Sequence, residues 1–197
     1  MKLIIGLGNP DKKYKKTRHN FGFLAIDYFQ SNSGDFDKWT PQEEFNSLIC
    51  EGKIGDEKII LAKPQTFMNH SGEAVLKLVN FYKTDLKDTW VIHDDCDLPL
   101  GVIRISKNAS AAGHKGADSI IKKLGSKNFV RFRLGIHPVG QTFLTIQFKK
   151  RLSLEKFVLK NFCKPELAIV QKTIKKTAQA IETAVKEGME KAMSEFN

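Results

Sequence analysis

Short apolar runs closed by turn residues alternate along this chain with longer amphipathic segments. The short runs predict strands at residues 3–8, 47–51, 58–62, 90–92, 102–106 and 129–136. Helical spacing of apolar residues predicts helices at residues 21–29, 73–82, 117–124 and 154–162, and again from Pro165 onward. Strands interspersed with helices in this way favour an α/β fold.

The first run, Leu3 to Gly8, is apolar throughout, which is the pattern of a strand buried on both faces. Such a strand needs helices on either side of its sheet. The runs 47–51 and 58–62 flank a polar stretch and predict a hairpin. We therefore expect one domain over residues 1–197, with a twisted, mixed and mostly parallel sheet covered by helices on both faces.

Several helix boundaries are predicted by residue type. Asn20 and Ser71 are good N-cap residues and precede two of the apolar-periodic segments. After Gly140 the chain becomes lysine-rich and helical. There Pro165 suits the first position of a helix, and the apolar stripe that follows continues as far as Met189.

Composition narrows the class of protein. A length of 197 residues with 41% hydrophobic content is enough to fill one sizeable core. No window approaches the ~18 apolar residues of a membrane span, and no secretory signal is recognisable. Cys50, Cys96 and Cys163 contain no CxxC pair, so neither a disulfide framework nor a structural zinc site is indicated. We expect a cytoplasmic protein without membrane association.

The charge balance is strongly basic. The chain has 32 Lys+Arg against 22 Asp+Glu, a net charge of +10. An excess of this size is common in proteins that bind nucleic acids, and it is also compatible with solubility alone. The positions of the basic residues must decide between the two.

The most suggestive chemistry lies just before the first helix, at Thr17-Arg18-His19-Asn20. The partial positive charge of a helix N-terminus disfavours imidazolium, which keeps His19 neutral and able to accept a proton. His19 is therefore a candidate general base. The alternative is a histidine with a purely structural role.

Polar residues follow other buried strands and could serve this base. Asn9 and Asn69 each follow a strand, where α/β folds build sites. After the strand at 90–92 comes His93-Asp94-Asp95-Cys96-Asp97, for which a metal site and a Cys-His nucleophile are less favoured alternatives. Because neighbouring parallel strands align their ends, we prefer Asp94 as the carboxylate that fixes the tautomer of His19.

Four further features leave alternatives open. Gly6 and Gly8 hint at a dinucleotide fingerprint, but Asp11 stands where that fingerprint needs a third glycine. Tyr14 lies among lysines and could stack on a base, or belong to a solvated loop. The small-residue loop 108–116 could admit a ligand or simply enter a helix. Arg131 and Arg133 share one face of a strand and suit either phosphates or acidic partners in the sheet.

The motifs together resemble those of the bacterial-type peptidyl-tRNA hydrolase family. The matching blocks are Gly6-Leu7-Gly8-Asn9-Pro10, Tyr14, Thr17 to Gly22, Lys63 to Gly72, His93-Asp94, Asp97-Leu98-Pro99, Gly113-His114 and Val158-Leu159-x-x-Phe162. The resemblance implies a monomeric α/β esterase, without cofactor, metal or protein partner, that releases tRNA from peptidyl-tRNA.

Family roles carried onto matching positions divide the site residues into two groups. The resemblance implies catalytic roles for His19 as the base, Asp94 as its orienting partner, and Asn9 and Asn69 as substrate-holding amides. It implies contacts to the substrate or tRNA for Tyr14, Met68, Arg104, His114, Lys115 and Arg133.

The chain departs from the family pattern at three places. Asp11 replaces a glycine, 108–112 replaces a glycine-rich run, and Lys115 replaces an asparagine that contacts the substrate. We expect Lys115 to alter substrate affinity while hydrolysis is retained. The rival functions are a non-hydrolytic RNA-binding relative of the same fold, for example in splicing, and a nucleotide-dependent oxidoreductase.

Overall fold

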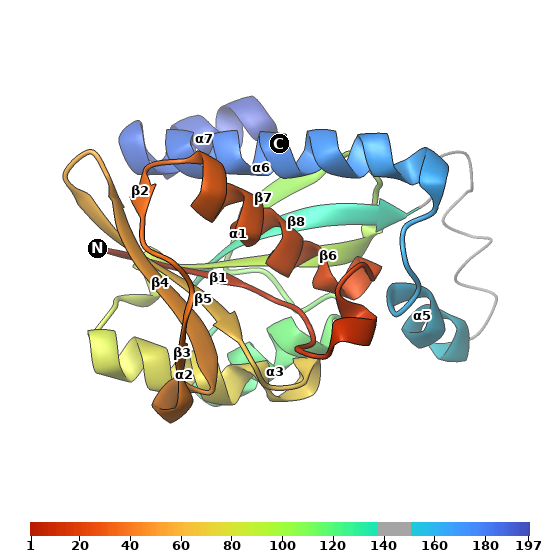
Figure 1. Cartoon of the computed structure of the whole chain (residues 1–197), viewed down its shortest axis with the longest axis horizontal. Helices are drawn as coiled ribbons and strands as arrows, with labels where there is room; N and C mark the ends of the chain where they lie inside the picture. The colour runs from red at the N-terminus through yellow and green to blue at the C-terminus, as the bar shows by residue number, and fades with distance from the viewer. Residues whose placement is uncertain (138–150) are drawn as a thin grey trace.

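The computed structural model describes residues 1–137 and 151–197, apart from the side chains of 151–153. Within these residues one sheet of eight strands runs through the molecule in the order β2-β4-β5-β1-β6-β8-β7, with β3 paired to β4 (Figure 1). The strands are β1 (Lys2–Gly6), β2 (Asp35–Phe36), β3 (Thr40–Gln42), β4 (Ser47–Ile54), β5 (Glu57–Pro64), β6 (Thr89–Pro99), β7 (Ile103–Lys107) and β8 (Val130–His137).

The expected mixed sheet is confirmed, and its parallel part is central. Strands β5, β1, β6 and β8 are parallel to one another, whereas β4 and β7 join the two sides of this group antiparallel. The predicted hairpin is formed by β4 and β5. Because the four central strands run in one direction, their carboxyl ends lie along the same edge of the sheet.

Helices cover both faces of the sheet (Figure 1). Helices α1 (Phe21–Asn32), α6 (Leu167–Lys186) and α7 (Met189–Phe196) lie on one face, and α2 (Ser71–Tyr82) and α3 (Lys115–Leu124) lie on the other. Helix α5 (Arg151–Val158) lies beside the carboxyl edge. Alternate residues of β1 enter the two cores, Ile4 on the α1 side and Leu3 and Ile5 on the α2 side, as expected for a strand buried on both faces.

The glycines of the first strand and helix set how closely α1 approaches the sheet. A Cβ at Gly6 would lie 2.6 Å from the carbonyl oxygen of Gly22. One at Gly22 would lie 2.5 Å from the backbone nitrogen of Leu7, and one at Gly8 would lie 2.6 Å from the ring of Phe23. The Gly6-x-Gly8 pair therefore serves helix packing, which accounts for these glycines without a dinucleotide.

Helix boundaries correct several expectations. Asn20 occupies the N-cap position of α1, but its side chain makes no capping hydrogen bond. The prediction for Ser71 is wrong, because this serine is the first residue of α2 and His70 holds the cap position. The long C-terminal helix ends at Lys186, since Gly188 has a φ of 97° that separates α6 from α7. The part of the lysine-rich helical stretch expected after Gly140 that extends to residue 150 lies outside the described residues. From Arg151 onward the chain is helical in α5.

Strand β6 is much longer than the predicted strand at 90–92. Its pairing with β1 stops at Ile92, while its pairing with β8 continues to Asp95 and, after an irregularity, resumes at Pro99. Residues His93 and Asp94 therefore project beyond the end of β1. Within the described residues, no helix is long and apolar enough to cross a membrane.

Candidate active site

A cleft of about 540 Å³ opens at the carboxyl edge of the central strands. Segments that follow β1 and β5 line it, together with the carboxyl half of β6, the loop before α3 and residues from α5 and just beyond it. Its lining residues are Asn9, Tyr14, His19, Phe67, Met68, Asn69, Asp94, Asp95, Cys96, Asp97, Ala112, Gly113, His114, Lys115, Leu154, Glu155, Val158 and Leu159. Of the ten residues to which the family resemblance gives catalytic or binding roles, eight line the cleft, and Arg104 and Arg133 do not.

His19 and Asp94 are hydrogen-bonded at the base of this cleft. His19 lies in the 3-10 helix η2 (Arg18–Asn20), and its Nδ1 is 2.9 Å from Asp94 Oδ1 and 3.1 Å from Oδ2. A carboxylate can only accept hydrogen bonds, so Nδ1 of His19 carries the proton. The Nε2 atom of His19 is then left with a lone pair, as a general base requires.

His114 is a second hydrogen-bond donor to the same carboxylate. Its Nδ1 accepts the backbone N–H of Ala117 at 3.1 Å, so its proton resides on Nε2, which lies 3.0 Å from Asp94 Oδ1. The same contact makes His114 the N-cap of α3. The rings of His19 and His114 are 4.9 Å apart between centroids. One buried carboxylate therefore orients two imidazoles.

The charge of Asp94 is maintained despite its burial, which leaves the residue 1% exposed. Desolvation alone would raise the pKa of its carboxyl group. Attraction and hydrogen bonds from His19 and His114 outweigh that effect and hold the pKa of Asp94 well below its usual range. Asp94 is consequently an anion wherever a histidine titrates, and it stabilises a positive charge that forms on His19.

Asn9 is held rigidly from both sides. Its backbone N–H donates to Asn20 Oδ1 at 2.9 Å, and its carbonyl accepts from Asn20 Nδ2 at 2.9 Å. Its side-chain oxygen accepts the backbone N–H of Met68 at 2.9 Å. With Oδ1 occupied, the group that Asn9 offers to the cleft is its Nδ2 amide, which is a donor.

The remaining cleft residues differ in how they are held. Asn69 is exposed in the 3-10 helix η4 (Met68–His70), with no side-chain hydrogen bond to the described residues. Met68 is buried beside it. Tyr14 is half-buried at the end of the 3-10 helix η1 (Lys12–Tyr14). Lys115 begins α3, and its Nζ lies 2.8 Å from Glu155 Oε1, so this departure from the family pattern forms a surface ion pair across the cleft.

The two remaining arginines lie outside the cleft, opposite each other on β7 and β8. Arg104 is exposed. The Nε of Arg133 donates to Asp95 Oδ2 at 2.6 Å, which places it against the wall of the cleft. The sequence left open whether the arginines of β8 contact phosphates or acidic residues of the sheet. Arg133 contacts an acidic residue of the sheet, Asp95. Arg131 is buried and only 1% exposed.

The group His19, Asp94 and His114 has the composition of a metal site, because one ligand atom of each lies within 4.8 Å of the others. However, the nitrogens of both histidines that face Asp94 carry protons and donate to it. Binding a cation would require His114 to give up the Nε2 proton while its other nitrogen still accepts from Ala117. The three residues therefore do not fit a metal ion.

Sequence patterns missed three contacts that shape the site. The bond from His114 to Asp94 joins residues 20 positions apart. The side chain of Asn20 holds Asn9 instead of capping its helix. Arg18 forms an ion pair with Glu166, 148 positions away. The Gly113-His114 motif was the only sequence signal for the contact between His114 and Asp94. No local sequence pattern predicts the contacts of Asn20 with Asn9 or of Arg18 with Glu166.

Comparisons with known proteins agree on one family. The sequence model of the family described as peptidyl-tRNA hydrolase matches residues 3–197. A peptidyl-tRNA hydrolase of Thermoanaerobacter sp. (strain X514) is 44% identical over 197 residues and covers 100% of both chains. One from Brevibacillus brevis is 42% identical over 200 residues, covering 100% of this chain and 98% of the relative.

Solved structures agree with the sequence relatives. The crystal structure of peptidyl-tRNA hydrolase from Acinetobacter baumannii superposes with a TM-score of 0.89 at 27% identity. The superposition covers 100% of this chain and 94% of that one.

Proposed function

The chain belongs to the peptidyl-tRNA hydrolase family, and we propose that it cleaves the ester bond between peptide and tRNA with His19 as the general base. The observation that carries this assignment is the hydrogen bond from His19 Nδ1 to the buried Asp94, which leaves Nε2 available in the cleft. An enzyme of this class recycles tRNA for translation.

The proposed reaction needs only groups of this chain and water. Nε2 of His19 takes a proton from a water molecule as its oxygen attacks the ester carbonyl. The imidazolium that forms is stabilised by the negative charge of Asp94, which is itself fixed by His114. The tetrahedral intermediate then expels the ribose oxygen of the tRNA, which recovers the proton from His19.

The developing oxyanion needs hydrogen-bond donors that are already in place. The Nδ2 group of Asn9 is pre-oriented because the side-chain oxygen is bound to Met68 and the backbone to Asn20. Asn69 supplies a second, exposed amide at the cleft. Fixed donors of this kind stabilise a transition state without reorganisation. We assign both asparagines to the attacked carbonyl and the adjoining peptide.

Substrate binding is assigned to the residues around this centre. Tyr14, Met68, His114 and Lys115 line the cleft, whereas Arg104 is exposed beyond it and Arg133, paired with Asp95, lies against its wall. A net charge of +10 suits a polyanionic substrate. The proposal treats residues 1–197 as one domain that acts as a cytoplasmic monomer without a protein partner.

The test is to incubate the protein with N-acyl-aminoacyl-tRNA, with and without a chelator, and to measure release of free tRNA. Release that is insensitive to chelator supports the proposed hydrolase. Release that is abolished by chelator contradicts the metal-free mechanism. Binding without cleavage would indicate the non-hydrolytic RNA-binding alternative.

A further inference from the structure

Arg18 immediately precedes the proposed base, yet its side chain makes its hydrogen bonds elsewhere. Its Nη2 donates to both carboxylate oxygens of Glu166, at 2.9 and 2.7 Å. Its Nη1 donates to the carbonyl of Asn161 at 2.7 Å and to that of Lys160 at 3.3 Å. The residue is only 6% exposed. A charge-assisted, largely buried guanidinium–carboxylate pair is among the stronger polar contacts that a protein makes.

Further contacts join the same two segments. The guanidinium of Arg18 lies over the ring of Phe157 at 4.4 Å and near that of Phe162 at 5.2 Å. The backbone N–H of Arg18 donates to the carbonyl of Lys160 at 3.0 Å, and Thr17 forms a β-bridge with Asn161. The loop that carries His19 is thus joined to the chain between α5 and α6.

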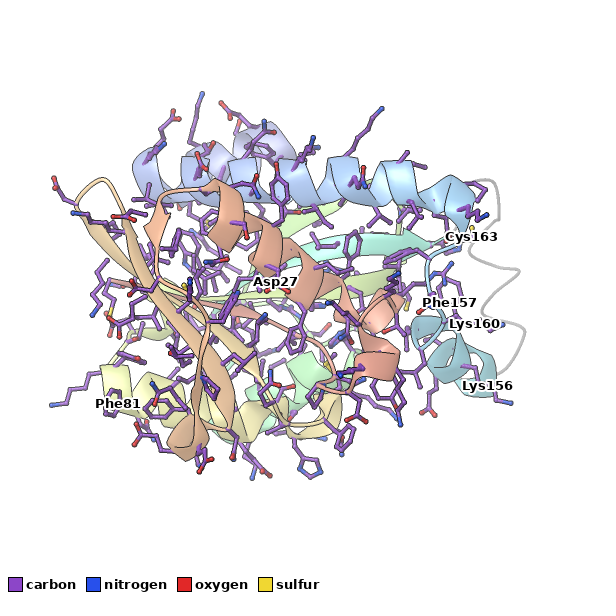
Figure 2. The ribbon with its side chains drawn as sticks, viewed as in Figure 1. Asp27, Phe81, Lys156, Phe157, Lys160 and Cys163 are labelled. Carbon is purple, nitrogen blue, oxygen red and sulfur yellow. The ribbon has the colours of Figure 1, made fainter. Side chains whose placement is uncertain are left out.

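This joined segment continues one wall of the cleft. Leu154, Glu155, Val158 and Leu159 line the cleft from α5 and the residue after it. Within the described residues, η2 is the main packing partner of α5. Figure 2 shows Phe157, Lys160 and Cys163 along the path from α5 to the start of α6, beside the rest of the molecule. Arg18 therefore links this wall directly to the loop that carries His19, in addition to the ion pair between Glu155 and Lys115.

We propose that Arg18 is a positioning residue that holds the α5 wall of the cleft over His19 through its ion pair with Glu166. The proposal rests on the proposed hydrolase function. We call Arg18, Glu166 and the carbonyls of Lys160 and Asn161 the Arg18 clamp. Its loss releases the wall, while the hydrogen bonds among His19, Asp94 and His114 do not involve Arg18.

Because Arg18 holds the α5 wall but not the hydrogen bonds among His19, Asp94 and His114, its loss should change KM more than kcat. A wall that contacts the substrate away from the reacting ester contributes equally to ground state and transition state, so its loss raises KM and spares kcat. We expect Arg18→Met to raise KM about tenfold or more while kcat stays within about threefold. Arg18→Lys keeps the charge but has one nitrogen in place of the two that bond Glu166 and the backbone carbonyls, so a smaller rise is expected. Glu166→Gln should act in the same direction as Arg18→Met.

The experiment measures kcat and KM for release of tRNA from N-acyl-aminoacyl-tRNA by these variants. Lys107→Gln is the matched control, because it removes the 2.6 Å ion pair with Glu190, which joins β7 to α7 away from the cleft. Amide hydrogen exchange of residues 154–162 is measured without substrate. It should rise in Arg18→Met and Glu166→Gln and remain at the wild-type level in Lys107→Gln.

Two results would overturn the clamp: an unchanged KM in Arg18→Met and Glu166→Gln, or a fall in kcat at unchanged KM. If Arg18→Met fails to fold, the milder Glu166→Gln decides. A wild type that releases no tRNA would refute the proposed function instead. The exchange comparison would still decide whether Arg18 holds the α5 wall.

Discussion

Asp94 is the residue on which the geometry of the site depends, because it accepts hydrogen bonds from both His19 and His114. Asp94→Asn preserves the size of the side chain but removes the charge that stabilises imidazolium and allows the wrong tautomer of His19. We predict a fall in kcat of about a hundredfold or more, measured by single-turnover release of tRNA. Asp118→Asn, on the exposed face of α3, is the control and should match the wild type. An Asp94→Asn enzyme of normal kcat would remove Asp94 from the mechanism.

His93 makes the stability of the fold sensitive to acid. Burial, and then the proximity of His114 and Arg131, hold the pKa of His93 well below 6.5 in the folded state. Below that pH the unfolded chain binds a proton that the folded chain cannot bind, so the free energy of unfolding decreases as pH falls. The loss attributable to this residue is up to about 1.4 kcal/mol per pH unit.

Urea unfolding between about pH 7 and pH 5 measures this loss, and His93→Gln should show the shallower dependence. The lowered pKa of Asp94 acts in a separate window, since its stabilising contribution is lost only below about pH 4. Equal pH slopes for wild type and His93→Gln would contradict the role given to His93.

For single residues, the sequence predicted the contacts that follow from a residue's position at a helix start or a strand end. His19 and Asp94 were paired from helix-start and strand-end arguments, and the hydrogen bond between them is present. The second histidine on Asp94 and the clamp by Arg18 depend on tertiary contacts across 20 and 148 positions. Asn20 satisfied a local cap pattern, yet its amide bonds the backbone of Asn9 instead.

Among the secondary-structure elements, the approach of α1 to β1 determines where His19 lies. Gly22→Ala would place a methyl group against the backbone of Leu7 and Ile92, and backbone cannot move aside as a flexible side chain can. We predict a destabilisation of several kcal/mol, at about the upper end of single substitutions, measured by urea unfolding. Gly55→Ala is the control for the steric clash, because nothing lies within 4 Å of the Cβ that it adds. Its positive φ of 57° adds only a modest backbone cost. A Gly22→Ala protein as stable as wild type would contradict this close packing.

The order and type of the central elements followed from the hydrophobic pattern, including the doubly buried first strand and the hairpin of β4 and β5. The extension of β6 beyond Ile92 was not predicted, because residues 93–97 are polar. Pairing with β8 keeps that stretch in strand geometry. The break at Gly188 was also missed, since the apolar stripe continues across it into α7.

For the whole molecule, the excess of basic residues predicts a salt-sensitive interaction with tRNA. The slope of log KM against log salt concentration should be positive, by about 0.7–0.9 for each phosphate contacted. A short N-acyl-aminoacyl ester of adenosine lacks the tRNA body, so its KM should depend little on salt. Steady-state kinetics over a range of salt concentrations test this. Equal slopes for the two substrates would show that the basic residues do not contact the tRNA body.

The central claim is that Nε2 of His19, oriented by Asp94, activates the water that cleaves peptidyl-tRNA. The most direct test is the rate of tRNA release from N-acyl-aminoacyl-tRNA by His19→Ala. The control is His70→Ala, an exposed histidine paired with Glu73. We predict a loss of about 10²–10⁴-fold for His19→Ala and a rate close to wild type for His70→Ala. A His19→Ala enzyme that releases tRNA at the wild-type rate would contradict the account.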